Sequence, residues 1–189
     1  MSEAEKSSHP WAQGELPASV RCGKGSLITG EKVFRRFFSL LDPAIVVGEH
    51  CHLDGVQFAL GQRARMTVGD YVFCTNTVVL AEQEIRIGSY VFVGFNTAIA
   101  DTDFHPLDPA QRMLDAIACS PAGQGRARPA IPTAPVIIED DVWIGPNCTI
   151  LKGVRIGAGA FLEPGTVVTR DIPARARVLG NPAQIVGEV

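Results

Sequence analysis

Residues 138–173 read IEDDVWIGPNCTILKGVRIGAGAFLEPGTVVTRDIP, and an aliphatic side chain returns at every sixth position of this stretch. The ladder consists of Ile138, Ile144, Ile150, Ile156, Leu162 and Val168. The fifth residue of each unit is small or β-branched: Val142, Cys148, Val154, Ala160, Thr166 and Ile172. A period of six matches neither the helical repeat of about 3.6 nor the strand repeat of 2. It is typical of a parallel β-helix, so we expect an all-β solenoid of short strands.

The same step continues upstream with interruptions. It begins near Ala44, slips by one residue before Ile87, stops at Asp101 and resumes at Val136. We therefore expect a β-helix domain over residues 44–187, interrupted by an excursion over 101–135, and an N-terminal extension over 1–43. The first 30 residues are polar and dotted with glycine, and we expect them to be loosely ordered.

Residues 31–41, EKVFRRFFSLL, place apolar side chains near helical spacing. This pattern predicts a short amphipathic helix that caps the open end of the solenoid and shields its unpaired strand edge. Arg35 and Arg36 leave a membrane-surface helix as the alternative.

The excursion consists of the polar run DTDFHPLDPAQR and the aperiodic run SPAGQGRARPAIPTAP. We expect it to be an irregular loop, because its second part is rich in Pro, Gly and Ala. Long loops that leave a regular scaffold are usually functional or disordered. Arg112, Arg126 and Arg128 would give this loop cationic reach toward a substrate or CoA.

Composition narrows the class of protein. The chain has 189 residues, is 46% apolar and 20% charged, and has a net charge of −3, which does not suggest a nucleic-acid partner. Its five cysteines are an odd number without a C-x-x-C motif, which favours a reducing compartment over a disulfide framework. The N-terminus lacks an apolar signal core and no apolar run is long enough to span a membrane, so we expect a cytoplasmic protein.

The repeat of residues 138–173, the closing GNPA of residues 180–183 and the FHPLDP of residues 104–109 together resemble the hexapeptide-repeat acyltransferases. The resemblance is strongest to the group of maltose and galactoside O-acetyltransferases and xenobiotic acetyltransferases. It is specific for residues 136–184 and for the loop histidine, and it is weak before residue 66. The resemblance implies a left-handed β-helix, a homotrimer, and acyl transfer from acetyl-CoA to a hydroxyl group.

Acyl transfer to a hydroxyl needs a base that removes the hydroxyl proton. His105 opens the excursion, and the resemblance makes it the catalytic base; the alternative is a surface loop histidine. Imidazole ordinarily titrates near ~6.5, which suits proton transfer at neutral pH. Asp101 and Asp103 are candidates to orient the ring, or they belong to a solvated turn. No Ser or Cys nucleophile constellation is visible, so we expect direct attack on the thioester.

The resemblance also points to acceptor-binding residues. Asn76 either contacts the acceptor or adopts a left-handed corner conformation. The position that often supplies an acceptor-binding Asn in relatives aligns better with Cys74, which weakens the assignment to a sugar. Glu82 aligns near an acceptor-site acid, or it is a solvated corner residue. N-acylation of an amino sugar and a non-catalytic binding scaffold stay as alternative functions.

On the donor side, Trp143 should point outward because Val142 belongs to the inward ladder. Its partner would be the pantetheine arm of CoA, a neighbouring subunit, or the excursion packed over it. In several relatives the residue after WIG offers its backbone N–H to the thioester oxygen, but Pro146 has no N–H, which leaves Gly145 as a candidate donor.

Arg170 stands where the family has a lysine near the CoA phosphates, and its alternative is a solvated basic face. The further expected CoA contacts are Gly157, Gly159, Ala160 and Thr169. No metal is predicted. His50 and His52 form an H-x-H pair, but two histidines do not complete a site, and the three-histidine pattern of a γ-carbonic anhydrase is not visible.

Overall fold

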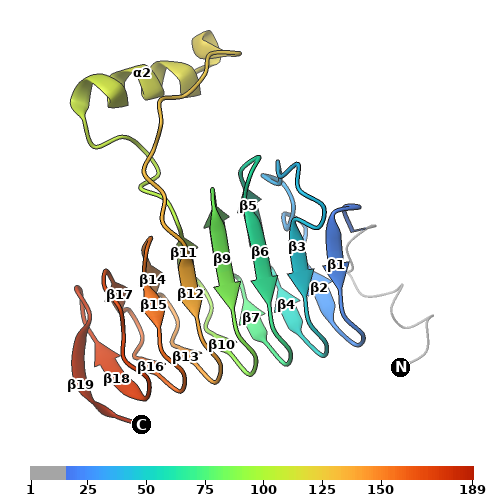
Figure 1. Cartoon of the computed structure of the whole chain (residues 1–189), viewed down its shortest axis with the longest axis vertical. Helices are drawn as coiled ribbons and strands as arrows, with labels where there is room; N and C mark the ends of the chain where they lie inside the picture. The colour runs from blue at the N-terminus through green and yellow to red at the C-terminus, as the bar shows by residue number, and fades with distance from the viewer. Residues whose placement is uncertain (1–15) are drawn as a thin grey trace.

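The computed structural model describes residues 16–189, and these wind into a solenoid whose walls are three sheets of short strands (Figure 1). The first sheet contains β1 (Val20–Cys22), β3 (Ile45–Val47), β6 (Arg65–Val68), β9 (Glu84–Ile87), β12 (Val136–Ile138) and β15 (Arg155–Ile156). The second contains β2 (Leu27–Thr29), β4 (His52–Asp54), β7 (Phe73–Thr75), β10 (Phe92–Val93), β13 (Trp143–Ile144), β16 (Phe161–Leu162), β18 (Ala176–Leu179) and β19 (Gln184–Glu188). The third contains β5 (Gln57–Leu60), β8 (Val78–Ala81), β11 (Ala98–Ala100), β14 (Thr149–Ile150) and β17 (Val167–Val168).

The chain visits the three sheets in turn, and all strand pairs are parallel apart from the antiparallel pair of β18 and β19 at the C-terminal end. The predicted all-β solenoid is therefore confirmed. Its left-handed sense of winding stays a prediction.

The six-residue ladder forms the core of the solenoid. Ile138 pairs in register with Ile156, and Ile144 pairs with Leu162, one full turn of three hexads later. All six ladder residues are at most 1% exposed. Burying one such side chain contributes about 1.5–3 kcal/mol to stability. The stacked ladder residues therefore make a large apolar contribution to the stability of the solenoid. Cys148 also faces inward, as predicted, and is 1% exposed.

Each turn passes a corner at which the backbone has a positive φ. Asn76, Asn96 and Asn147 stack at one such corner with φ values of 44°, 60° and 59°. Gly55 continues this column, and a Cβ atom there would lie 2.3 Å from Oδ1 of Asn76. A side chain at this position would require the Asn76 amide to move, and glycine adopts this conformation without strain.

The N-terminal extension differs from expectation. Strands β1 and β2 pair in parallel with β3 and β4, so stacking already begins at Val20 and residues 20–29 are not loosely ordered. The division at residue 44 stays a prediction, and the first part of the extension, residues 1–15, lies outside the described residues.

The helix predicted over residues 31–41 does not form, and that prediction was wrong. Residues 31–36 form turns, and the N–H of Phe38 donates to the carbonyl oxygen of Leu60 at 2.8 Å. The ring of Phe34 stacks on Phe58 of β5 with centroids 5.7 Å apart. Residues 31–41, which we call the strap, therefore run irregularly along the edge of β5, where Phe37 pairs in parallel with Leu60. Tertiary packing overrides the apparent helical spacing.

The excursion, which we call the arm (residues 101–135), leaves after β11 and returns into β12. It contains the helix α2 (Pro109–Cys119) and a short 3₁₀ turn (Pro121–Gly123), so the expectation of an irregular loop was wrong for these residues. Asp108 caps α2 by accepting the N–H of Gln111 at 2.9 Å, and Pro109 occupies the first turn. In Figure 1 α2 stands away from the strands. Within residues 16–189, no helix has the length and apolarity needed to cross a membrane.

Candidate active site

His105 lies at the start of the arm in a three-residue network with Asp115 and Arg128. Nδ1 of His105 lies 2.6 Å from Oδ2 of Asp115. Arg128 donates from Nε to Oδ1 of Asp115 at 2.6 Å and from Nη2 to Oδ2 at 3.0 Å. The Asp115 side chain is fully covered, whereas the imidazole of His105 is 58% exposed. The network therefore holds the ring from one side and leaves its other nitrogen accessible.

The charge state of Asp115 decides the tautomer of the ring. Hydrogen bonds from Arg128 and His105 hold the pKa of the Asp115 carboxyl well below its usual range. An ionised carboxylate only accepts hydrogen bonds, so we assign the hydrogen of the neutral imidazole to Nδ1. Nε2 then carries a free lone pair, which is the arrangement that a general base needs.

The orienting acid is not one of the two that the sequence suggested. The carboxylate of Asp101 is buried and accepts the N–H groups of Glu82, Gln83 and Glu84, each at 2.7 Å, so it caps the turn before β9. Asp103 forms a salt bridge with Lys152 at 3.2 Å. Both predictions were wrong, because the acid lies on a helix whose fold brings it back to His105.

Asp115 and Arg128 are the functional residues that sequence reasoning missed in these roles. Arg128 was expected to reach toward a substrate, but it neutralises Asp115 and donates from Nη2 to the carbonyl oxygen of Phe104 at 3.0 Å. The D-P pair of residues 108–109 is a helix-start signal that could have revealed α2 and its face. The pairing across thirteen residues has no such local signal.

The exposed face of His105 borders a hollow of about 360 Å³. Its walls come from the third sheet, the strap and the arm, and they include Leu80, Glu82, Arg36 and Arg128. Burial and the nearby Asp101 raise the pKa of Glu82, and Arg128 opposes this shift. The structure thus brings together His105 and Glu82, one of the predicted acceptor residues.

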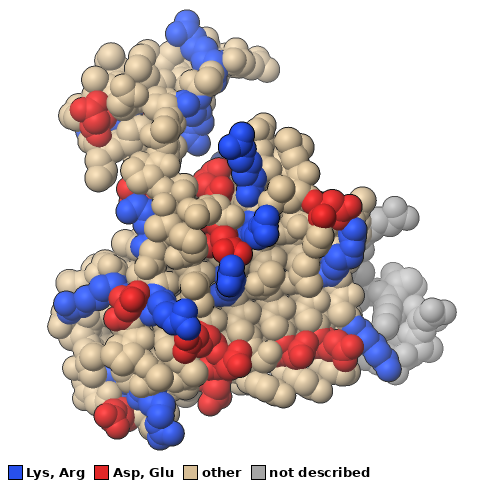
Figure 2. All heavy atoms as spheres, viewed as in Figure 1, with Lys and Arg blue, Asp and Glu red and all other residues tan. Residues whose placement is uncertain are grey.

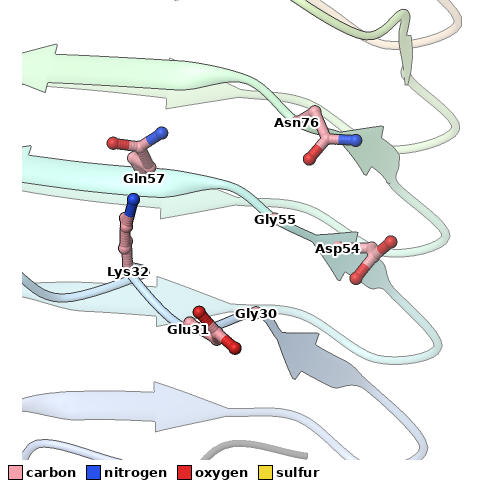
Figure 3. Close-up of a pocket in the computed structure, with 7 residues that line it drawn as sticks. All are labelled: Gly30, Glu31, Lys32, Asp54, Gly55, Gln57 and Asn76. Atoms are coloured by element: carbon pink, nitrogen blue, oxygen red, sulfur yellow. The ribbon is translucent and has the colours of Figure 1, made fainter. Parts of the chain in front are cut away.

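Asn76 lies in a different hollow of about 480 Å³ with Glu31, Lys32 and Asp54 (Figure 3). Its positive φ matches the corner alternative, and it does not line the hollow of His105. Cys74 faces the solenoid interior at 2% exposure, and burial raises the pKa of its thiol to about 12. The Cys74 side chain is therefore a core residue, and its predicted contact with the acceptor was wrong.

Trp143 points outward from the second sheet, as predicted. Its ring stacks on Phe161 with centroids 4.4 Å apart and remains 57% exposed, so the arm of its own chain does not cover it. Phe92 and Phe73 precede it in register on the same face and are 55% and 40% exposed. This aromatic row is an apolar surface of the kind that usually meets a partner or a ligand.

The backbone around Pro146 offers no free oxyanion donor at the expected place. The N–H of Gly145 already donates to the carbonyl oxygen of Leu162 at 2.8 Å. The N–H of Gly157 donates to the carbonyl oxygen of Ile172 at 2.8 Å, and the N–H of Gly159 donates to the carbonyl oxygen of Asp140 at 3.0 Å. These groups are part of the hydrogen-bond ladder of the solenoid, so Gly145 cannot replace the donor that proline lacks without breaking a ladder bond.

The predicted CoA contacts do not gather in one place. Gly157, Gly159 and the buried Ala160 lie at the corner between β15 and β16. Thr169 and Arg170 are exposed after β17, on the corner from which the arm departs two turns earlier. Nη2 of Arg170 donates to Oε1 of Gln184 at 3.2 Å. One chain alone therefore does not assemble Trp143, Arg170 and His105 into a single pocket.

The two other histidines within residues 16–189, His50 and His52, have aromatic neighbours. The ring of His50 stacks on Tyr71 with centroids 5.0 Å apart, and His52 meets Phe73 edge-on at 5.4 Å. Within residues 16–189, no group of three or more His, Cys, Asp or Glu side chains is placed to hold a metal ion.

The repeat and the fold are both similar to those of known proteins. Residues 135–170 match the family model described as bacterial transferase hexapeptide (six repeats). The 2,3,4,5-tetrahydropyridine-2,6-dicarboxylate N-acetyltransferase of Staphylococcus aureus is 57% identical over 53 residues, which cover 28% of this chain. The match spans only 22% of the length of that relative.

Solved structures match over more of the chain. Galactoside acetyltransferase in complex with coenzyme A has a TM-score of 0.62 over 77% of this chain and 64% of its own, and at 24% identity it shows the shared fold. A hexapeptide-repeat-containing acetyltransferase of Vibrio cholerae is 31% identical, with a TM-score of 0.58, over 82% of this chain and 76% of its own. The same Vibrio cholerae protein has been solved in complex with acetyl-CoA. The extent and identity of this match show that the chain belongs to the hexapeptide-repeat acetyltransferases.

Proposed function

We propose that the protein transfers an acetyl group from acetyl-CoA to a hydroxyl of a sugar, a glycan precursor or a small natural product. The observation that carries this proposal is the His105–Asp115–Arg128 network beside an open hollow. The imidazole exposes Nε2, while its Nδ1 is held by a buried carboxylate. Acyl transfer to a hydroxyl requires a base of this kind.

In the proposed reaction Nε2 of His105 removes the proton of the acceptor hydroxyl. The hydroxyl oxygen attacks the thioester carbonyl and the carbon–sulfur bond breaks. The leaving CoA thiolate then receives the proton from the imidazolium of His105. Asp115 keeps the ring in the required orientation and stabilises its charged form while the proton resides there. Arg128 keeps Asp115 ionised through its two hydrogen bonds.

Negative charge develops on the thioester oxygen during the reaction. The hydrogen-bond donor that stabilises it must be a group outside residues 145–146. Pro146 has no N–H and the N–H of Gly145 is used within the sheet. Loss of one oxyanion donor typically costs about 10²–10³ in kcat, so we expect another group to supply this hydrogen bond.

We infer a homotrimer in which acetyl-CoA lies between neighbouring subunits. Three apolar side chains on α2, Met113, Leu114 and Ile117, are 61%, 48% and 40% exposed, and the Trp143 row is exposed on another wall. Cyclic closure would bury both surfaces. It would also bring the arm of one subunit near the second-sheet face of the next, so that Trp143 and Arg170 could serve the donor while His105 serves the acceptor.

Transfer to an amine is the second candidate, because the Staphylococcus aureus relative is named an N-acetyltransferase. The same base could deprotonate the ammonium group of an amino sugar. A binding scaffold without turnover is less well supported. A scaffold has no need of a histidine that a buried acid holds in place, and Asp115 holds His105 while its other oxygen pairs with Arg128. The cytoplasmic location expected from the sequence stays a prediction.

Thiol release from acetyl-CoA, measured with matched pairs such as glucose and glucosamine, tests the proposal. We expect thiol release with hydroxyl acceptors and its loss in His105→Ala. Turnover with amines alone would favour the N-acyl alternative. Absence of any acetyl-CoA-dependent transfer across sugars and amino sugars would contradict both enzymatic functions.

A further inference from the structure

Three hollows adjoin one another along the outward side of the third sheet and beneath the arm. The hollow of His105 shares Glu82, Arg128 and Ile131 with a neighbouring hollow of about 650 Å³. On its other side it shares Arg36 and Leu80 with a hollow of about 220 Å³. Together they form one groove, which we call the arm-side groove, with His105 in its middle section.

The arm-side groove is lined by a strong excess of cationic side chains. Its five cations are Lys32, Arg35, Arg36, Arg63 and Arg128, and its one carboxylate is Glu82. The whole chain has a net charge of −3, so this excess is local. On the face shown in Figure 2, basic and acidic side chains are interspersed. The cationic stretch ends at the hollow of Asn76, where Glu31 and Asp54 enter the lining.

Two guanidinium groups of the arm-side groove, those of Arg36 and Arg63, lack a carboxylate partner within the described part of the chain. Among residues 16–189, no carboxylate forms a salt bridge with either guanidinium, whereas Arg128 is bound to Asp115. Glu82 is the one carboxylate of the lining and lies beside Arg128, which already pairs with Asp115. Arg36 lines the same section of the groove as His105, and Arg63 lines the next. A planar guanidinium without a partner matches a carboxylate or phosphate in a two-point hydrogen bond.

We propose that the acceptor is an anion whose carboxylate or phosphate group binds Arg36, with Arg63 adding to the positive potential, while its reacting hydroxyl or amine lies at His105. This inference rests on the proposed function and specifies the chemical class of its acceptor. The phosphates of CoA are the competing source of negative charge, and the kinetics of the donor and the acceptor separate the two.

The experiment compares acceptors that differ only in charge: galacturonate with galactose, and glucose 6-phosphate with glucose. Binding to the full-length protein is measured by calorimetry, and KM is measured at saturating acetyl-CoA. We expect the anionic member of at least one pair to bind about ten-fold more tightly, as one charge-assisted contact allows. Raising the salt concentration to about 0.5 M should reduce this preference by screening, and should leave the neutral member unchanged. The two pairs distinguish a carboxylate from a phosphate.

The decisive variant is Arg36→Gln, with Arg65→Gln on the first sheet as the matched control outside the groove. Arg36→Gln should remove most of the preference for the anion and leave KM for acetyl-CoA unchanged, and Arg65→Gln should alter neither. Equal binding of charged and neutral members would overturn the proposal, and so would an Arg36→Gln variant that weakens only acetyl-CoA. Because calorimetry needs no turnover, the charge preference is decided even if no acceptor is acetylated, an outcome that would count against the proposed function separately.

Discussion

Nδ1 of His105 lies 2.6 Å from Oδ2 of Asp115, which is ten residues further along the chain in helix α2. The helix therefore places a covered acid behind an imidazole whose other side is open. The pair stands at the base of an arm and not on the solenoid wall, so the chemistry proposed here depends on the fold of the arm.

Replacing His105 by Ala should lower kcat by about 10²–10⁴, because that is the typical contribution of a general base. The strands do not depend on this exposed side chain, so circular dichroism and binding of CoA should match those of the wild type. Steady-state kinetics with acetyl-CoA and an accepted substrate make the measurement. A variant with near-normal turnover would show that His105 is not the base.

Asp115→Asn should lower kcat with less effect on KM for acetyl-CoA, because an amide no longer stabilises the imidazolium and can present the wrong hydrogen-bonding group to Nδ1. Asp103→Asn is the matched control, since that acid lies near the same loop but pairs with Lys152. The control should retain most of its activity. If both variants lose activity equally, the 2.6 Å contact is not what matters.

Acid should loosen the arm before the solenoid. The folded-state pKa of Asp115 is depressed, so its contribution to stability is present above the ordinary aspartate pKa of about 3.9 and is lost as the pH falls below it. Hydrogen exchange should therefore show protection of α2 falling between about pH 5 and pH 2. Asp115→Asn should have a weakly protected α2 throughout this range. Uniform loss of protection in arm and strands would contradict a local effect.

The protein should sediment and scatter as a homotrimer of about 60 kDa, three times the 20.2 kDa of one chain. Met113→Glu should shift the equilibrium toward smaller species if the arm packs on a neighbour, because it would bury an unpaired charge. Light scattering at micromolar concentration is the measurement. A wild-type monomer would rule out a donor site shared between subunits.

Ile144→Ala should destabilise the solenoid by about 2–5 kcal/mol, because this ladder side chain is fully buried and the coils above and below cannot close the cavity. Ile185→Ala is the matched control, since that isoleucine is 60% exposed on β19. It should change stability by no more than about 0.5 kcal/mol. Urea unfolding of both variants gives the comparison, and similar losses would argue against the ladder as the main stabilising stack.

The six-residue period predicts the solenoid, because a residue that recurs at every sixth position meets an equivalent residue one turn later. For this reason Ile144 pairs in register with Leu162, and the same repeat places Trp143 outward and Cys148 inward. Periodic local spacing predicts such contacts without knowledge of the rest of the fold. The start of α2 was also within reach, since Asp108 and Pro109 form a standard helix start.

The partner of His105 and the conformation of residues 31–41 depend on long-range packing. Asp101 and Asp103 were nearer in sequence, but the fold assigned one to backbone capping and the other to Lys152. Phe34 and its neighbours had helical spacing, yet packing on Phe58 outweighed a weak local preference. Neither outcome follows from a repeat, because each depends on which surface a non-periodic segment happens to meet once the solenoid has formed.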